Sequence, residues 1–451
     1  MTHPLEGHRH IHFVGIGGIG MSALARWLLA QHYDVSGSDR DPGEQGEALA
    51  QLGARVSAGH RADAIVGADL VVVTSAVGPD NPEVLAAEDR GILVLKRAEL
   101  LSWIFNAGRG IAVAGTHGKT TTSALVGHFL IAAGLDPTIL IGGISASLGS
   151  NARVGGQLVV AEADEYDGSF LRLRPEIAVL TNVEDDHPDF YGTSEQVYDA
   201  FRQFAHGITD RLVYCADDPI AGGIAREVSA TAIGYGLDSG EWQASGLSEK
   251  DGFTHFTVEH NGTHTPYTSA LFGRHNVLNA LAAIVVAASL DVPVEVIQTA
   301  LPAFTGVARR LEVKGDAAGV LVLDDYAVHP TEVRAALAAV KQRYKRPVRV
   351  VFQPHTYSRT KAFLADFACA FRDADVVYLL DIYAAREHDS LGISGQDLSS
   401  AVCRCHSNVH YTRTIDDTVA VLVDECNVGD VVVTMGAGNV FRLGPRLLAE
   451  L

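Results

Sequence analysis

Residues 115–121 have the composition and spacing of a phosphate-binding turn. They read Gly-Thr-His-Gly-Lys-Thr-Thr, follow an apolar strand at 111–114, and precede a helix that runs through 123–132. In this arrangement backbone N–H groups and the helix dipole face an anion. Lys119 would reach the β- and γ-phosphates, and the Thr120 hydroxyl would bind Mg²⁺. We therefore predict an ATP or GTP site made by Gly115, Thr116, His117, Gly118, Lys119, Thr120 and Thr121.

Carboxylates and a histidine follow two further strands and could hold metal ions, with the histidine completing a second site. Glu162 comes directly after an apolar strand at 158–160, within Ala-Glu-Ala-Asp-Glu. His187 ends an acidic loop that follows the strand at 177–180. Carboxylate oxygens at this edge of a sheet are where a Mg²⁺–triphosphate complex needs ligands. We predict Thr120, Glu162 and His187 as metal ligands, although a loop histidine alone is more often a surface residue.

A second glycine-rich turn lies near the start of the chain. Gly-Ile-Gly-Gly-Ile-Gly (15–20) follows a strand at 10–14 and precedes a helix at 21–31, and a second strand at 33–38 ends next to Asp39. This order is typical of a Rossmann unit, in which glycines allow a diphosphate close to the backbone and the acid binds a ribose. A further strand at 70–75 ends at Ser75. NAD is the default ligand, but the turn at 115–121 favours another diphosphate such as a nucleotide-sugar. The predicted contacts are Gly15, Gly17, Gly18, Ile19, Gly20, Asp39 and Ser75.

Further polar residues stand at the start of a helix and after later strands. Asn276 opens a long apolar helix and could bind a purine or a ribose, or could simply cap the helix. His329 follows a strand at 321–323, and His355 and Arg359 follow another at 348–352. Ligands bind at the carboxyl ends of strands in open α/β sheets. We therefore expect a third binding region in the last part of the chain.

Length and composition limit the possible classes of protein. A chain of 451 residues is expected to hold about three domains. The net charge of −19 makes nucleic acids and anionic membranes poor partners. Five scattered cysteines do not form a disulfide framework, and neither a signal segment nor a long apolar run is found, so a cytoplasmic location is expected.

Four motifs together resemble the Mur ligase family. They are Gly-Thr-His-Gly-Lys-Thr-Thr (115–121), Glu-Ala-Asp-Glu (162–165), Asn-Val-Glu-Asp-Asp-His (182–187) and Gly-Arg-His-Asn (273–276), and Gly-Ile-Gly-Gly-Ile-Gly-Met-Ser (15–22) resembles the branch that uses L-alanine. The resemblance covers essentially the whole chain in the right order. It implies ATP contacts for Asn276, Arg309 and Asp324, and it implies that His329, His355 and Arg359 help to place an amino acid. Relatives usually have Gly-His-His-Pro where this chain has Ala-Val-His-Pro (327–330), which leaves no histidine at Val328.

The implied fold is α/β, with three domains that are each built on a mostly parallel sheet: a Rossmann-like UDP-sugar domain (1–107), a P-loop ATPase-like domain (108–308) and a Rossmann-like amino-acid domain (309–451). The implied reaction joins L-alanine to the lactyl carboxylate of UDP-N-acetylmuramate through an acyl phosphate, with ATP and Mg²⁺, in peptidoglycan synthesis. Lys119, Glu162, His187 and His329 are the expected catalytic residues, with His329 as base. A monomer or weak homodimer is expected. The alternatives are a ligase for a recycled tripeptide, a NAD-dependent oxidoreductase and a non-catalytic nucleotide-binding module.

Overall fold

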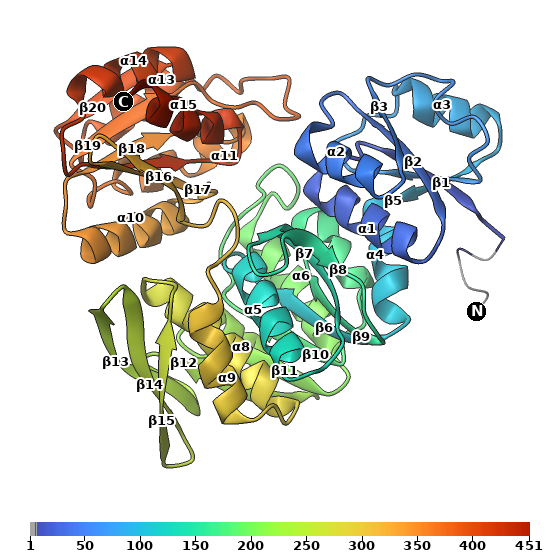
Figure 1. Ribbon diagram of the computed structural model, residues 1–451, viewed down its shortest axis with the longest axis horizontal. Coiled ribbons are helices and arrows are strands. Elements are labelled where there is room, and N and C mark those ends of the chain that lie inside the picture. Colours follow the sequence, from blue (N-terminus) through green and yellow to red (C-terminus); the bar gives the residue numbers. More distant parts are fainter. Residues whose placement is uncertain (1–4, 6) are drawn as a thin grey trace.

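The structure is a computed structural model that describes residue 5 and residues 7–451. Three sheets, each made from a continuous part of the chain, define three α/β domains (Figure 1). The blue first domain and the red third domain both lie against the green central domain. This confirms the predicted fold class.

The first domain is a five-stranded parallel sheet with the strand order β3-β2-β1-β4-β5. The strand order reverses between β1 and β4, and ligands bind at such a switch point. The glycine turn at 15–20 follows β1, and Thr74 and Ser75 follow β4, so both stand at this point. The elements are β1 (His10–Val14), α1 (Ile19–Ala30), β2 (Asp34–Asp39), α2 (Gly43–Gln51), β3 (Arg55–Ala58), β4 (Leu70–Val73), α3 (Pro82–Asp89), β5 (Leu93–Lys96) and α4 (Arg97–Asn106).

The central domain contains a ten-stranded sheet with the order β15-β14-β13-β12-β11-β10-β6-β9-β7-β8. The carboxyl ends of β6, β9 and β10 meet at one edge, because these neighbours are parallel. Helices α5 and α8 pack against each other, and α8 is buried on most sides because it is apolar almost all round. The antiparallel strands β13, β14 and β15 extend the sheet away from the first domain (Figure 1).

The strands of the central domain are β6 (Arg109–Ala114), β7 (Thr138–Ser145), β8 (Ser150–Arg153), β9 (Leu158–Glu162), β10 (Ile177–Leu180), β11 (Arg211–Cys215), β12 (Thr231–Gly236), β13 (Trp242–Lys250), β14 (Phe253–His260) and β15 (Thr263–Ser269). Its helices are α5 (Lys119–Ala132), η1 (Tyr166–Arg172), α6 (Ser194–His206), α7 (Pro219–Ala225), α8 (Arg274–Ser289), α9 (Val294–Ala300) and η2 (Leu301–Ala303), where η marks a 3₁₀ helix.

The third domain has a six-stranded sheet with the order β16-β17-β21-β18-β19-β20, in which only the edge strand β16 is antiparallel to its neighbour. Its strands are β16 (Glu312–Ala317), β17 (Val320–Asp325), β18 (Val348–Phe352), β19 (Val376–Leu380), β20 (Val409–Arg413) and β21 (Val431–Met435). Its helices are α10 (Pro330–Tyr344), α11 (Tyr357–Ala362), α12 (Leu364–Ala368), α13 (Gly395–Val402), α14 (Ile415–Glu425), η3 (Asn439–Arg442) and α15 (Leu443–Glu450).

The cysteines and the helices can be compared with what the composition predicts. A disulfide joins Cys369 to Cys405, a pairing that the scattered cysteine spacing does not predict. In the part of the chain that the structure describes, the helices are too short or too polar to span a bilayer.

Candidate active site between three domains

The phosphate-binding turn lies between β6 and α5 and packs directly on α8. Gly118 has a φ of +81°, and a Cβ atom there would lie 2.3 Å from the Asn279 amide oxygen. Only glycine combines this left-handed backbone with so close an approach. The first turn of α5 begins at Lys119, so its backbone N–H groups face the loop as the sequence predicts.

Lys119 is held by an acidic partner in this structure. Its Nζ donates to Glu165 Oε2 at 2.8 Å and to the Gly115 carbonyl oxygen at 2.7 Å. Burial alone would lower the pKa of Lys119, but the neighbouring carboxylates, Glu165 above all, raise it above its usual value. The ammonium group is therefore charged and already lies inside the turn where a phosphate would bind.

The predicted metal ligands fall into two groups. Glu162, the last residue of β9, accepts a hydrogen bond from the Gly142 N–H at 2.7 Å and contacts the Thr120 hydroxyl. Burial raises the pKa of Glu162. His187 instead lies with Glu165 and Asp186, and ligand atoms of these three residues lie within 4.8 Å of one another. Hydroxyl and carboxylate oxygens are donors that Mg²⁺ prefers, so Thr120, Glu162, Glu165 and Asp186 fit that ion.

A smaller cavity of about 240 Å³ lies beside the turn, between the central and third domains. His117, Gly118, Thr121 and Asn276 line it, as the sequence predicts for a nucleotide. The Asn276 side chain donates to the Phe272 carbonyl oxygen and accepts from Asn279, which also lines the cavity.

The smaller cavity differs from the prediction at two positions. Arg310 and Asp325 line it, whereas the expected residues, Arg309 and Asp324, bind each other at 3.0 Å. Arg309 also donates to the Gly436 carbonyl oxygen at 2.5 Å. Asp325 lines the cavity in place of Asp324 because side chains alternate along a strand. The two residues are consecutive in β17, so their side chains point to opposite faces of the sheet. Burial raises the pKa of Asp325 to about 6.

His117, which lines this cavity, lies against a histidine of the third domain. The ring centroids of His117 and His329 lie 4.8 Å apart. His117 Nε2 lies 3.4 Å from Glu184 and its Nδ1 lies 3.2 Å from Glu332. Burial opposes protonation of His117, yet the two carboxylates raise its pKa to about 9. His117 is therefore an imidazolium at neutral pH that joins the phosphate-binding turn to helix α10.

His329, in contrast, is uncharged at neutral pH. Burial and the adjacent His117 charge lower its pKa, so the imidazole is neutral near pH 7. Its Nδ1 accepts a hydrogen bond from the Thr331 N–H at 3.3 Å and caps α10. Its Nε2 is buried and has no hydrogen-bond partner among the described residues. As the acceptor, Nδ1 carries no proton in this arrangement, so Nε2 carries the proton of the neutral ring.

The predicted amino-acid residues of the third domain contact the central domain. Arg359 is buried, and its Nε donates to Asp186 at 2.9 Å, one residue before His187. Its Nη1 lies 3.2 Å from His355 Nδ1. Burial and the Arg359 charge lower the pKa of His355 to about 3, so this imidazole is neutral. The structure therefore brings His355, Arg359 and His187 into one region.

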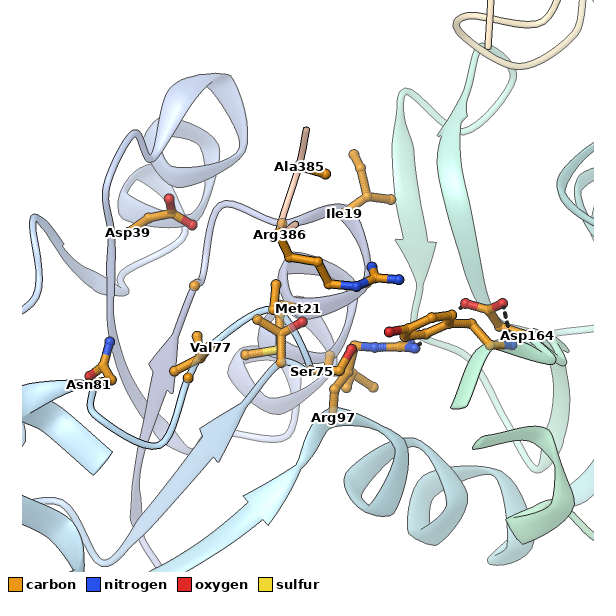
Figure 2. A pocket seen from close by; sticks show the side chains of 18 of the residues that line it. Ile19, Met21, Asp39, Ser75, Val77, Asn81, Arg97, Asp164, Ala385 and Arg386 are labelled. Carbon is orange, nitrogen blue, oxygen red and sulfur yellow. Dashed lines mark hydrogen bonds and ion pairs between the residues drawn. The ribbon is translucent and has the colours of Figure 1, made fainter. Parts of the chain in front are cut away.

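A larger cavity, of about 1130 Å³, lies between all three domains. It is lined by most of the residues predicted for a nucleotide-sugar: Gly15, Gly18, Ile19, Gly20, Asp39 and Ser75. Gly17 instead donates its N–H to Asp39 Oδ2 at 3.0 Å, which means that Asp39 also holds the glycine turn in place. Figure 2 shows Asp39 and Asn81 toward one end of this cavity and Asp164 at the other.

Comparison with known proteins decides the family. The Mur ligase family catalytic-domain model matches residues 10–109, the Mur ligase middle-domain model matches residues 113–287, and the Mur ligase glutamate-ligase-domain model matches residues 309–438. Together they cover most of the chain. The chain belongs to the Mur ligase family.

Individual Mur ligases resemble the chain over almost its full length. It is 46% identical over 448 residues to a UDP-N-acetylmuramate–L-alanine ligase of Geobacter sp. (strain M21), covering 98% of this chain and 97% of that protein. It is 45% identical over 451 residues to the protein of the same name from Geotalea daltonii, covering 98% of each.

Solved structures of Mur ligases also resemble the chain over almost its full length. The UDP-N-acetylmuramate-alanine ligase of Thermotoga maritima matches with a TM-score of 0.84 at 29% identity, covering 98% of this chain and 99% of that one. The murein peptide ligase of Psychrobacter arcticus matches with a TM-score of 0.76 at 26% identity, covering 98% of each chain.

Sequence reasoning missed several residues that this Mur ligase places in its two cavities. Arg97 at the start of α4 and Arg386 after β19 line the larger cavity. Arg310 and Glu332 line the smaller one. Arg386 follows a strand of the third sheet, but the sequence offers no signal that it lines a cavity together with residues of the first domain.

Proposed function

We propose that this Mur ligase joins L-alanine to the lactyl carboxylate of UDP-N-acetylmuramate, with cleavage of ATP to ADP and phosphate. The observation that carries the proposal is the position of the phosphate-binding turn between two cavities. Glu162 lines the larger cavity, and His117 and Gly118 of the turn line the smaller one. A nucleotide-sugar in the first and ATP in the second would meet at Lys119 and Glu162. The two similar relatives named above carry the corresponding name.

The first proposed step activates the carboxylate. A lactyl carboxylate oxygen attacks the γ-phosphorus of ATP, and the bond from this phosphorus to the β,γ-bridging oxygen breaks. ADP departs, and the muramyl group is now an acyl phosphate. Two anions must approach each other, so cations have to neutralise them. Lys119 and Arg310 are the protein's candidates, since one lies in the turn and the other lines the smaller cavity.

The second proposed step forms the amide. The neutral amine of L-alanine attacks the acyl carbon, and the carbon–oxygen bond to phosphate breaks after a tetrahedral intermediate. His329 is the candidate base, because its ring is neutral near pH 7. The amine proton would go to Nε2 in the tautomer whose proton lies on Nδ1, 3.5 Å from Glu184 Oε2, and that tautomer gives up the hydrogen bond from the Thr331 N–H. Arg359 and His355 would bind the amino acid, beside His187.

One or two Mg²⁺ would be held through Thr120, Glu162 and His187. When bound, Mg²⁺ supplies positive charge to the transferring phosphoryl group. The Thr120 and Glu162 side chains are already in contact. His187 Nε2 lies 3.9 Å from Glu165 Oε1, so Glu165 would be a further carboxylate available to Mg²⁺ beside His187.

The proposed domain boundaries are 1–107, 108–308 and 309–451, with hinges near 108 and 308. Closure about these hinges would exclude water from the acyl phosphate. We expect the enzyme to act in the cytoplasm on free UDP-N-acetylmuramate, without nucleic acid or membrane insertion.

Phosphate release from ATP tests the proposal. The enzyme is assayed with Mg²⁺ and UDP-N-acetylmuramate, with and without L-alanine, and then with glycine, L-serine or a stem tripeptide in its place. Release that needs both substrates and favours L-alanine supports the proposal. Release with the tripeptide alone would assign the chain to the recycling ligases, and NAD binding without release would overturn the ligase assignment.

A further inference from the structure

The third domain contributes a cation to the cavity that the first domain dominates. Ala385, Arg386 and His388, from the loop after β19, line the larger cavity. Figure 2 shows Arg386 extending from the loop at Ala385 toward the region between Ile19 and Asp164. This side chain therefore belongs to the wall of a site whose residues outside this loop come from the first two domains.

Contacts with the central domain hold Arg386 in this position. Its Nη2 donates to Asp189 Oδ2 at 2.5 Å, and its Cζ lies 4.3 Å from the centroid of the Tyr166 ring. Asp189 lies two residues after His187, and Tyr166 lies one residue after Glu165. The guanidinium group is thus fixed by residues adjacent to the phosphate-binding machinery.

The position along the cavity indicates which part of a substrate Arg386 meets. A nucleotide bound at the glycine turn and Asp39 occupies one end. Glu162, Asp164 and Tyr166 line the other end, next to Lys119, where the carboxylate must react. Arg386 reaches this second end, as its contact with Tyr166 shows.

The charge balance gives a reason for a cation there. Glu162 and Asp164 face the cavity, and an additional carboxylate would be repelled by them. Arg97 lies 3.9 Å from Asp164 and offsets one of these charges. Arginine has five N–H donors in a planar fork and can bind a carboxylate while it retains Asp189.

We propose that Arg386 is a substrate-binding residue whose guanidinium donates hydrogen bonds to the lactyl carboxylate of the nucleotide-sugar. This inference rests on the proposed function and names one residue of its substrate site. Because Arg386 belongs to the third domain, the bound carboxylate favours the closed arrangement of the third domain on the other two. The competing explanation is an interdomain ion pair with Asp189 that does not contact the substrate.

Direct binding distinguishes these explanations. Calorimetry measures the affinity of the full-length protein for UDP-N-acetylmuramate and for UDP-N-acetylglucosamine, which lacks the lactyl carboxylate. Arg386→Gln is expected to weaken binding of the first about 10- to 100-fold, as expected for a lost hydrogen bond to a charged group, and of the second less than about 3-fold. Equal weakening of both ligands, or no change in either, would overturn the inference.

Two further variants separate structure from recognition. Asp189→Asn removes the charge of the interdomain partner but keeps Arg386, so it is expected to preserve the preference for the muramate ligand. Loss of that preference equal to the loss in Arg386→Gln would assign Arg386 to the ion pair alone. Arg446→Gln breaks an exposed pair with Asp416 within the third domain and serves as the matched control, with both affinities unchanged. If the wild-type protein prefers the muramate ligand but does not ligate L-alanine, the proposed function fails while the binding inference stands.

Discussion

Lys119 and Glu165 form an ion pair inside the phosphate-binding turn, with Nζ 2.8 Å from Oε2, although 46 positions separate them in the sequence. The pair places the ammonium group of Lys119 where the motif requires it before any phosphate is present. A triphosphate must therefore replace or share this carboxylate. Glu165 also lies near His187, so the same exchange links phosphate binding to the proposed metal ligands.

Removal of the Lys119 charge is expected to abolish most turnover. Lys119→Met should lower kcat by about 10²–10³-fold, because a preorganised cation at the transferring phosphoryl group is lost. Steady-state phosphate release measures the effect. Lys341→Met, which removes an exposed lysine paired with Asp375, is the control and should retain wild-type turnover. An active Lys119→Met enzyme would contradict the assignment of the turn.

Arg359 is expected to determine the affinity for the amino acid. Arg359→Lys keeps the charge but loses the planar geometry that contacts both Asp186 and His355. The KM for L-alanine should rise about 10-fold or more, while the KM for ATP stays within about 2-fold. The matched control is Arg349→Lys, since Arg349 forms a similar pair with Asp430 in the same domain. The assignment fails if both variants change the KM for L-alanine equally.

His117 should make the stability of the protein depend on alkaline pH. Its folded-state pKa of about 9 lies above the ordinary value of 6.5, so its stabilising contribution is complete below pH 6.5 and is lost as the pH rises through 9. The size is on the order of 3 kcal/mol. The Tm of the wild-type protein should therefore fall more between pH 7 and pH 9.5 than the Tm of His117→Gln. His128→Gln, at a histidine that contacts the Ala300 carbonyl oxygen, should behave as the wild type. Parallel curves for all three proteins would refute the ion-pair contribution.

His329 should control the acid limb of the pH–rate profile. Burial lowers its pKa, so the neutral base persists to a pH below its ordinary value of 6.5. His329→Gln is expected to lower kcat about 10²–10⁴-fold and to remove that limb, since general-base catalysis is lost. His406→Gln, at a histidine after α13 that contacts the Ala374 carbonyl oxygen, is the control and should retain the wild-type turnover and the acid limb. If His329→Gln has normal turnover and the same pH–rate profile as the wild type, another group takes the proton.

Motifs that follow strands could be interpreted from the sequence, because local order determines where such a turn lies. Gly115, Lys119 and Glu162 stand at the carboxyl ends of β6 and β9, as expected. Contacts between distant segments could not be predicted in this way. Arg386 and Asp189 are 197 positions apart, and their pairing depends on how two domains pack.

The sequence pattern also could not predict which of two consecutive residues in a strand faces the cavity. Asp324 and Asp325 differ only in the face of β17 to which they point, and an error of one position moves a side chain from the cavity to the interior. The same uncertainty of one position applies to Arg309 and Arg310. The Cys369–Cys405 disulfide likewise depends on the tertiary structure around α12 and α13 and not on cysteine spacing.

An isotope-transfer experiment tests the central claim most directly. UDP-N-acetylmuramate labelled with ¹⁸O in its lactyl carboxylate is incubated with the enzyme, Mg²⁺, ATP and L-alanine, and the released phosphate is analysed by mass spectrometry. The proposed acyl phosphate predicts one ¹⁸O atom in each phosphate, together with formation of the alanyl amide. Unlabelled phosphate, or amide formation without ATP cleavage, would contradict the account.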